Sequence, residues 1–426
     1  MLDIKLVREN PEIIEQDLNK RGAVDKIGEL HELIIKDKER RHIIQKVEDL
    51  KCKRNKITKI IADKKKKNLE VSREMKEMKD IPDEIKELDK RLDKLNSECK
   101  NMLMRLPNIL HDSVPIGKDD NDNIEVKRWG LVPEFRFKPK NHLEILQGLN
   151  LIDSERAAKI SGHGFFYMKN ELVLLDHAIQ RFAIDFLMKK GFLLVQPPYM
   201  MNRKPYEGVT DLAAFQDVLY KIEGEDLYMI ATSEHPMAAM HMDEVFEKKE
   251  LPLKFMGISP CFRKEVGAHG KYTKGLFRMH HFNKIEQFVF CLPDQSWQFH
   301  EEIQCNSEEL YKALEIPYRV VNVCTGDIGD IAAKKYDIES WMADGHYREI
   351  GSNSNCTDYQ ARRLNIKWRD VEGKAPEGFV HTLNNTALAT SRAMVAIIEN
   401  GQQEDGSIKI PKALWPYTGF KEISRR

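Results

Sequence analysis

One stretch of the chain excludes most compact folds: from Leu30 to Leu106 it has no glycine and one proline, Pro82. Apolar residues recur there at alternating spacings of four and three, which is typical of the apolar seam of a coiled coil. The polar segment Asp63–Asn68 separates two such runs. We therefore predict two long helices folded into an antiparallel hairpin, with an intermolecular coiled coil as the alternative. The runs are Ile43, Val47, Leu50, Ile57 and Ile61, then Ile85, Leu88, Leu92, Leu95, Cys99, Met102 and Leu106.

The end of this predicted hairpin is strongly basic. Residues 51–67 hold nine basic side chains against one acid, Asp63, a net charge of +8. Because the signs are not mixed, we favour binding to a phosphate backbone over a merely solvated helix face. No aromatic residue lies among the lysines, so base reading is not predicted. The basic residues are Lys51, Lys53, Arg54, Lys56, Lys59, Lys64, Lys65, Lys66 and Lys67.

Composition narrows the class of protein. The 426 residues carry 68 basic and 68 acidic side chains and are 41% hydrophobic, which suits a folded protein with a polar helical segment. No apolar run approaches the ~20 residues of a membrane span, and the first residues lack the apolar core of a signal peptide. Seven cysteines are scattered without a C-x-x-C pair. We therefore expect a cytoplasmic protein with no membrane partner.

Beyond the hairpin the pattern predicts an α+β domain. A helix is expected over Leu172–Lys190, ended by Gly191 and followed by a strand at Phe192–Val195. Several short apolar runs follow at hairpin-like spacing, which favours an antiparallel β-sheet flanked by helices over regular βαβ units. There is no Gly-rich dinucleotide or P-loop motif. The expected divisions are 1–105 for the helical arm, 106–171 for a connector and 172–426 for the core of the α+β domain.

One segment carries the chemistry. Phe262–Glu265 reads as a strand, the polar loop 267–275 follows, and a second strand returns toward Glu286. Arg263 and Glu265 would share a face, as would Phe282 and Glu286. The set offers a guanidinium for phosphate, an aromatic plate for a purine and carboxylates for amine or hydroxyl groups. A plain surface ion pair between Arg263 and Glu265 is the alternative.

This segment resembles motif 2 of the class II aminoacyl-tRNA synthetases, and among them the seryl-tRNA synthetases. That family carries F-R-x-E, then a loop ending in G-L-x-R-x-H-Q-F, then K-x-E. The chain departs from it here only at His281, where glutamine is usual.

Other segments resemble the same family in the same order. Thr232–Glu234 is similar to its T-x-E serine-binding loop, and Glu349–Asn355 to the segment with its ATP and magnesium ligands. Thr382–Arg392 resembles motif 3, and Gly191–Pro198 resembles motif 1, a dimer-interface element. The N-terminal hairpin resembles the arm that grips the long variable arm of the family's tRNA.

The resemblance implies a fold and an activity. The fold would be an antiparallel two-helix coiled-coil arm joined to a class II catalytic domain, and the protein a homodimer. The activity would be that of a serine–tRNA ligase, which makes seryl-adenylate and pyrophosphate from serine and ATP and transfers serine to tRNA(Ser), and by family also to tRNA(Sec). The alternatives are an adenylate-forming ligase with a non-tRNA acceptor and a non-catalytic RNA-binding paralogue.

The resemblance also implies roles for individual residues. Arg263 would hold the α-phosphate and Arg392 the γ-phosphate, as the catalytic pair. Serine would be bound by Thr232, Ser233, Glu234, Glu286, Asn384 and Thr386. ATP would be bound by Arg263, Lys264, Glu265, Met279, Phe282, Glu349, Ile350, Gly351, Ser352 and Arg392.

We expect a magnesium site and no zinc site. Glu349 and Ser352 would hold Mg²⁺, since oxygen ligands suit a hard cation. His280 and His281 are adjacent and would point to opposite faces of a strand, so no zinc site is expected. Departures from the family pattern at Asn385–Ala387 and at Ser391 leave the shape of the serine pocket open.

Overall fold

The structure is a computed structural model that describes residues 1–210, 212, 217–265 and 275–425. The predicted polar loop lies outside these residues, apart from Gly275. The chain divides into two compact units, Met1–Pro107 and Asn108–Arg426.

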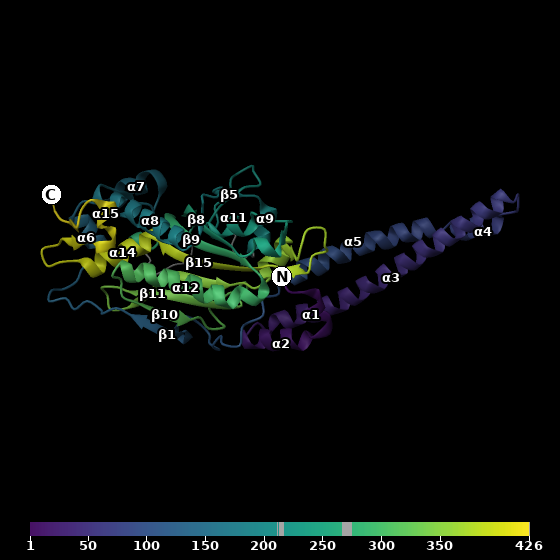
Figure 1. Ribbon diagram of the computed structural model, residues 1–426, viewed down its shortest axis with the longest axis horizontal. Coiled ribbons are helices and arrows are strands. Elements are labelled where there is room, and N and C mark those ends of the chain that lie inside the picture. Colours follow the sequence, from purple (N-terminus) through teal and green to yellow (C-terminus); the bar gives the residue numbers. More distant parts are fainter. Residues whose placement is uncertain (211, 213–216, 266–274, 426) are drawn as a thin grey trace. The chain divides into compact units, whose positions relative to one another are not determined.

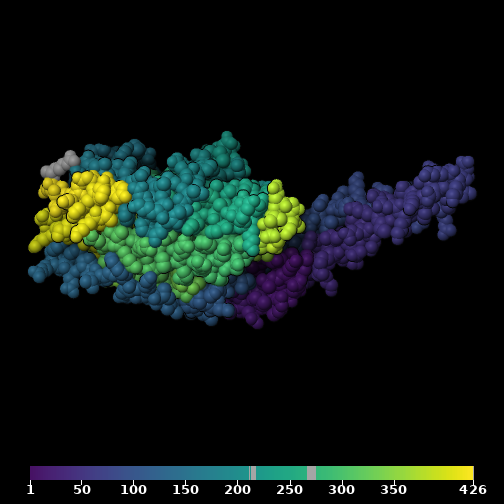
Figure 2. Space-filling view, in the orientation of Figure 1, coloured from purple at the N-terminus to yellow at the C-terminus, as the bar shows by residue number. Residues whose placement is uncertain are grey.

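The first unit is entirely helical within the described chain. It contains α1 (Ile4–Glu9), α2 (Pro11–Lys20), α3 (Asp25–Lys66), α4 (Ser72–Met78) and α5 (Ile81–Arg105). Figure 1 shows α3 and α5 running alongside each other, and Figure 2 shows how slender this pair is. The predicted hairpin is therefore confirmed.

The hairpin closes through the apolar residues that predicted it. Ile43, Val47 and Ile57 of α3 are buried against Ile85 and Leu95 of α5. Such a seam stabilises helices whose outer faces are almost wholly charged.

The chain reverses direction slightly later in the sequence than the polar segment Asp63–Asn68 indicated. Asp63 to Lys66 are still helical, and the chain turns over residues 67–71. Asn68 has φ 53°, a left-handed conformation that asparagine tolerates better than most residues.

A buried carboxylate fastens the short first helix to α3. Arg8 donates to both oxygens of Asp37, at 2.7 and 2.8 Å. Arg40 and Arg41 donate to the same carboxylate. Burial alone would raise the pKa of Asp37, but the hydrogen bonds from Arg8 and Arg40 hold it below its usual value.

The second unit is built on an eight-stranded sheet in the order β1-β10-β11-β12-β15-β9-β8-β4. Neighbouring strands are antiparallel throughout except for β4, which pairs parallel with β8. The strands are β1 (Ile124–Trp129), β10 (Tyr318–Asn322), β11 (Lys334–Trp341), β12 (Tyr347–Asn355), β15 (His381–Ala389), β9 (His281–Cys291), β8 (Leu253–Phe262) and β4 (Leu193–Val195). The predicted antiparallel sheet is confirmed.

Three long helices pack against this sheet (Figure 1). They are α8 (Glu171–Lys189), α12 (Ser296–Ala313) and α14 (Thr390–Gly401), and their apolar faces join the strands in one core. Gly191, with φ 83°, follows α8 and leads into the edge strand β4.

Shorter elements complete the second unit. The helices are α6 (His142–Gly148), α7 (Ser154–Ser161), α9 (Arg203–Val209), α11 (Glu234–Ala239), α13 (Tyr359–Leu364) and α15 (Trp415–Thr418). The strands are β2 (Ile152–Asp153), β3 (Tyr167–Met168), β5 (Met200–Met201), β6 (Tyr228–Met229), β7 (Val245–Glu247), β13 (Lys367–Arg369), β14 (Gly378–Phe379), β16 (Ile408–Lys409) and β17 (Glu422–Ile423). Among the described residues, no helix has the length and apolar character needed to cross a bilayer.

Candidate active site

Strand β9 forms the floor of the site. Its neighbours are β8 on one side and β15 on the other, so Glu286 lies opposite Gly257 and Thr386. Alternation along the strand puts Phe282 and Glu286 on one face, as the sequence predicted. The predicted strand at Phe262–Glu265 ends earlier, at Phe262, and Glu265 has φ 48°.

A cavity of about 360 Å³ opens over this face. It gathers eight predicted residues from segments far apart in the sequence: Thr232, Glu234, Arg263, Glu286, Glu349, Ser352, Asn384 and Thr386. It is also lined by residues that were not predicted, among them Lys284, Lys335 and the segment 327–332.

One end of the cavity is acidic. Glu286 Oε2 accepts a hydrogen bond from Thr386 Oγ1 at 3.2 Å and lies 2.7 Å from Lys284 Nζ. At the N-terminus of α11, the backbone N–H of Glu234 donates to Thr232 Oγ1 at 3.1 Å. Two carboxylates, two hydroxyls and an ammonium group therefore meet within a small volume.

The two carboxylates affect each other. Burial, with the negative charge of Glu286 nearby, raises the pKa of Glu234 to about 7. Burial likewise raises the pKa of Glu286, which Lys284 opposes. Such an end of a cavity attracts a cationic group, because an ammonium would relieve the repulsion between the two acids.

The other end of the site, the arginine end, is formed by Arg263, which lines the cavity, and by Arg392, which does not line it but pairs with the lining residue Glu349. Arg263 Nε donates to the carbonyl oxygen of Ala231 at 3.1 Å, and its guanidinium lies 5.4 Å from the centre of the Phe282 ring. Arg392 Nη1 lies 3.1 Å from Glu349 Oε1. The charge of Arg392 lowers the pKa of Glu349.

The alternative reading of motif 2, a surface pair between Arg263 and Glu265, is wrong. Glu265 Oε2 accepts instead from Arg278 Nε at 2.5 Å. Arg263 is therefore not neutralised by that carboxylate and keeps its guanidinium at the cavity, where an anion fits.

Oxygen ligands lie beside Glu349. Ser352 Oγ donates to Asp337 Oδ1 at 2.5 Å, and these two residues face each other across β12 and β11. Carboxylate and hydroxyl oxygens suit a hard divalent cation, so the donor set fits Mg²⁺. In the ranges that the structure describes, no three His, Cys, Asp or Glu side chains gather as a metal-binding group.

Eight predicted residues do not line this cavity: Ser233, Lys264, Glu265, Met279, Phe282, Ile350, Gly351 and Arg392. Ser233 is buried and its hydroxyl donates to the carbonyl oxygen of Gly257 at 3.3 Å. Met279 and Ile350 are buried in the sheet core, so only their backbone groups are available. The ammonium group of Lys264 lies 5.9 Å from the ring centre of Tyr220.

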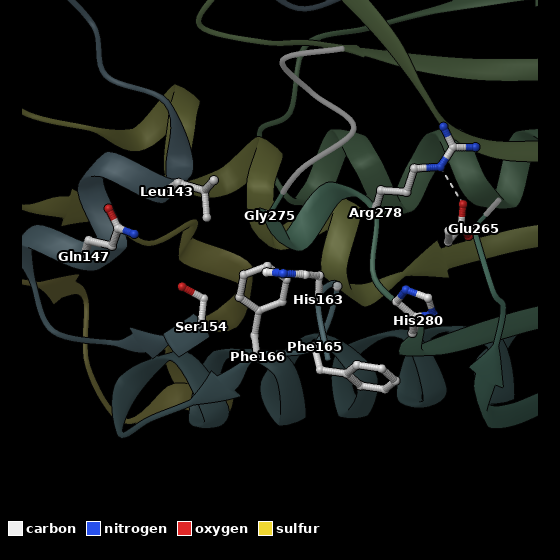
Figure 3. A pocket seen from close by; sticks show the side chains of 11 residues that line it. Leu143, Gln147, Ser154, His163, Phe165, Phe166, Glu265, Gly275, Arg278 and His280 are labelled. Atoms are coloured by element: carbon white, nitrogen blue, oxygen red, sulfur yellow. Dashed lines mark hydrogen bonds and ion pairs between the residues drawn. The ribbon is translucent and has the colours of Figure 1, made fainter. Parts of the chain in front are cut away.

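A second cavity, of about 530 Å³, lies beside the ion pair between Glu265 and Arg278. Figure 3 shows this pair at one side of the cavity and Gln147 with Ser154 at the other. His280 also lines it, stacked on Phe165 with ring centres 4.9 Å apart. Glu265 therefore borders this cavity instead of the first one.

The sequence reasoning missed Lys284, which lines the first cavity, and Asp337, which lies behind it and accepts a hydrogen bond from Ser352. Lys284 lies two residues from both Phe282 and Glu286. Because residues two apart on a strand share a face, the sequence was enough to place Lys284 on the same face as these two residues. Asp337 carried no such signal, because only the register between β11 and β12 places it opposite Ser352.

Family models of tRNA synthetases match both units of the chain. The family model of the seryl-tRNA synthetase N-terminal domain matches residues 1–110, and that of the class II core domain of tRNA synthetases (G, H, P, S and T) matches residues 219–401. The serine–tRNA ligase of Methanocella arvoryzae is 55% identical over 418 residues, which are 98% of this chain and 98% of that protein.

Two solved structures are similar over the whole chain. The crystal structure of seryl-tRNA synthetase from Pyrococcus horikoshii, complexed with ATP, is 50% identical, with a TM-score of 0.96 and 100% of each chain covered. The cytoplasmic serine-tRNA ligase from Naegleria fowleri, in complex with AMP, is 35% identical, with a TM-score of 0.90 and 100% and 99% covered. With this identity and coverage, the chain belongs to the seryl-tRNA synthetase family.

Proposed function

We propose that this chain is a serine–tRNA ligase, which activates L-serine with ATP and transfers it to tRNA(Ser). The observation that carries the proposal is the cavity over β9, which brings the acids Glu234 and Glu286 together with Arg263, next to the pair of Arg392 with Glu349. A zwitterionic amino acid and a nucleoside triphosphate need the acidic end and the arginine end of the site side by side. The relatives, ligases of the same name over nearly their whole length, support the same activity.

The amino acid would occupy the acidic end. Glu286 and Glu234 would bind its ammonium group, and Thr232, Asn384 and Thr386 its remaining polar atoms. Such a pocket favours serine over alanine, because alanine would leave buried polar groups unpaired. The backbone next to Ser233 would complete the wall.

The nucleotide would occupy the arginine end. Phe282 would stack on adenine, with the backbone of Met279 at its edge and with Glu265 reaching it from the neighbouring second cavity. Arg263 would hold the α-phosphate and Arg392 the γ-phosphate, with Lys264 and the backbone of Ile350 and Gly351 alongside. A planar guanidinium holds two phosphate oxygens at once, which suits both positions.

The reaction itself needs little acid–base chemistry. An oxygen of the serine carboxylate attacks the α-phosphorus, the bond to the bridging oxygen breaks, and pyrophosphate leaves with the electron pair. The protein contributes alignment and positive charge where negative charge accumulates. The ribose hydroxyl at the end of the tRNA then displaces AMP from the adenylate.

A magnesium ion fits the oxygen ligands beside the arginine end. Glu349 and Ser352 would hold it, and it would supply charge neutralisation to the phosphates when bound. The carboxylate of Glu349 is half-exposed and is therefore accessible to the ion.

The partners follow from the two units. The helical arm, 1–105, would bind tRNA through Lys51, Lys53, Arg54, Lys56, Lys59 and Lys64 to Lys67, and residues 172–426 would form the catalytic core behind the connector 106–171. By family, the enzyme would also serve tRNA(Sec). Its seven cysteines are all free thiols, which suits a cytoplasmic location.

A homodimer is the proposed assembly. Its support is the edge of the sheet, where Leu193 and Leu194 of β4 are 58% and 47% exposed. Met188, near the end of α8, is also exposed. A second copy covering this edge would bury these side chains.

ATP–pyrophosphate exchange tests the activity directly. We expect exchange with serine and at least about 100-fold less with threonine, alanine or glycine. Arg263→Ala should lower exchange by about 100-fold or more, because it removes charge at the α-phosphate. Arg156→Ala, on the exposed face of α7, is the matched control.

Three outcomes would contradict the proposal. Preference for another amino acid would overturn the serine assignment. Serine-dependent exchange without charging of total tRNA would favour a ligase with another acceptor. No exchange by folded protein with magnesium present would leave a non-catalytic RNA-binding protein.

A further inference from the structure

A buried lysine in the cavity has no role in the mechanism above. The side chain of Lys284 is 8% exposed and that of its neighbour Glu286 is 1% exposed. Lysine is rarely buried to this degree, because removing an ammonium from water is costly unless a charge compensates it. Lys284 lines the cavity together with Arg263 and Glu286.

The position of Lys284 along β9 is informative. Phe282, Lys284 and Glu286 alternate onto the same face, about 7 Å apart from one to the next. Phe282 marks the proposed adenine end and Glu286 the proposed serine end. Lys284 therefore stands between them, where the α-phosphate and the amino acid must meet.

Because serine is small, its carboxylate must lie close to Lys284. When its ammonium group is bound at Glu286, its carboxylate is only two bonds farther along and must lie toward the arginine end. The ammonium group of Lys284 lies 2.7 Å from Glu286 Oε2. It is therefore within a short side-chain movement of an oxygen of that carboxylate.

The charges of the pocket favour such a movement. In the free enzyme, Lys284 Nζ and Thr386 Oγ1 both lie at Glu286 Oε2. Serine brings an ammonium that competes for this oxygen and a carboxylate that attracts Lys284. The exchange of partners conserves charge, since one ammonium replaces another at Glu286.

We propose that Lys284 is a further catalytic residue, whose ammonium group contacts the serine carboxylate and the α-phosphate at the point where they react. This inference rests on the proposed function. Lys284 takes part in no bond exchange: the carboxylate oxygen bonds to the α-phosphorus, and pyrophosphate leaves with the electrons of the broken bond. Lys284 offsets negative charge as the two anions approach, beside Arg263.

Kinetics of ATP–pyrophosphate exchange distinguish this role from a structural one. Lys284→Gln should lower kcat by about 100-fold, while KM for serine changes by less than about tenfold. Lys284→Arg keeps a cation and should recover kcat to within about tenfold of the wild type. Lys254→Gln is the matched control, since Lys254 lies on neighbouring β8 and pairs with Glu302 at 3.1 Å, outside the cavity.

Two kinetic results would overturn the inference. One is a kcat within about threefold of the wild type for Lys284→Gln. The other is a raised KM for serine with unchanged kcat, which would mean that Lys284 serves only to hold Glu286. Thermal unfolding of each variant identifies loss of fold.

A measurement on the wild type keeps the inference testable if Lys284→Gln does not fold. In a crystal structure with a seryl-sulfamoyl adenosine analogue, Lys284 Nζ should lie within about 3.5 Å of a carbonyl or sulfamoyl oxygen. If the ammonium group of Lys284 remains on Glu286 and does not contact the analogue, the inference is overturned. Absence of serine-dependent exchange by the wild type would instead overturn the proposed function.

Discussion

At the scale of single residues, the serine end of the cavity depends on the ionisation of two neighbouring carboxylates. Glu234 is the more sensitive, because its raised pKa of about 7 falls within the working range of an enzyme. Burial is the main cause and Glu286 adds to it, while Lys284 and Arg263 act in the opposite direction. An ammonium substrate requires the ionised form of such a group.

We predict that KM for serine rises as the pH falls below about 7. Below that pH Glu234 is protonated in the free pocket, so serine binds only with loss of that proton, at up to about tenfold per pH unit. The measurement is KM for serine in pyrophosphate exchange between about pH 5.5 and 8.5. Glu234→Gln should abolish this dependence at the cost of weaker binding.

KM for ATP in the same assays is the internal control for this prediction. A flat profile for serine in the wild type would contradict the role of Glu234. An equal rise of KM for ATP would place the titrating group elsewhere.

At the scale of elements, acidic residues of α4 reduce the positive charge at the basic end of the helical arm. Two of the nine basic residues in 51–67 form ion pairs with acidic residues of α4. These acids lie outside residues 51–67, so the net charge of that segment does not include them. Lys53 Nζ lies 3.1 Å from Glu77 Oε1, and Lys64 Nζ lies 2.6 Å from Glu74 Oε1. The basic surface is therefore weaker than the net charge of the window indicated. Exposed ion pairs of this kind contribute little to stability.

We predict that Lys56→Ala, Lys59→Ala and Lys65→Ala together weaken binding of tRNA(Ser). All three side chains are exposed on α3, and alanine preserves the helix. Each lost phosphate contact should reduce the slope of log K against log salt by about 1. Binding measured from about 50 to 200 mM salt checks both effects.

A matched control for this prediction lies on the same hairpin. Lys90 and Lys94 of α5 pair with Glu87 and Glu98 and lie outside the basic window. Their replacement by alanine should leave the salt slope unchanged. Equal weakening by both sets would show that binding is not located at residues 51–67.

At the scale of the whole molecule, the open question is how the sheet edge at β4 is covered. This strand has only three residues and pairs with β8 alone in the sheet order. Exposed leucines on a short edge strand are a liability for a protein that remains a monomer. Motif 1, which the segment resembles, is a dimer-interface element.

We predict that Leu193→Asp with Leu194→Asp converts a dimer to a monomer. Buried leucines contribute about 1.5–3 kcal/mol each, so the dimer dissociation constant should rise by about 100-fold or more. Sedimentation velocity over a concentration series measures it. Leu131→Asp, at a side chain that is 92% exposed, is the control and should leave the dimer intact. A monomeric wild type would contradict the prediction.

Local residue patterns were enough to predict the helical arm, the antiparallel sheet and eight residues that line the first cavity. The spacing of Ile43, Val47 and Ile57 was enough for the hairpin, because a coiled-coil seam depends only on local periodicity. The F-R-x-E and K-x-E patterns were enough for Arg263 and Glu286, since strand alternation is equally local. The position of Lys284 was available from the same rule.

Contacts between segments that are distant in the sequence could not be predicted in this way. The register of β11 against β12 brings Asp337 to Ser352, and the turn at residues 67–71 brings Glu77 to Lys53. The partner of Glu265 is likewise Arg278, thirteen residues away in the sequence. Pairings of this kind are selected by strand register and packing, which no local pattern of residue types encodes.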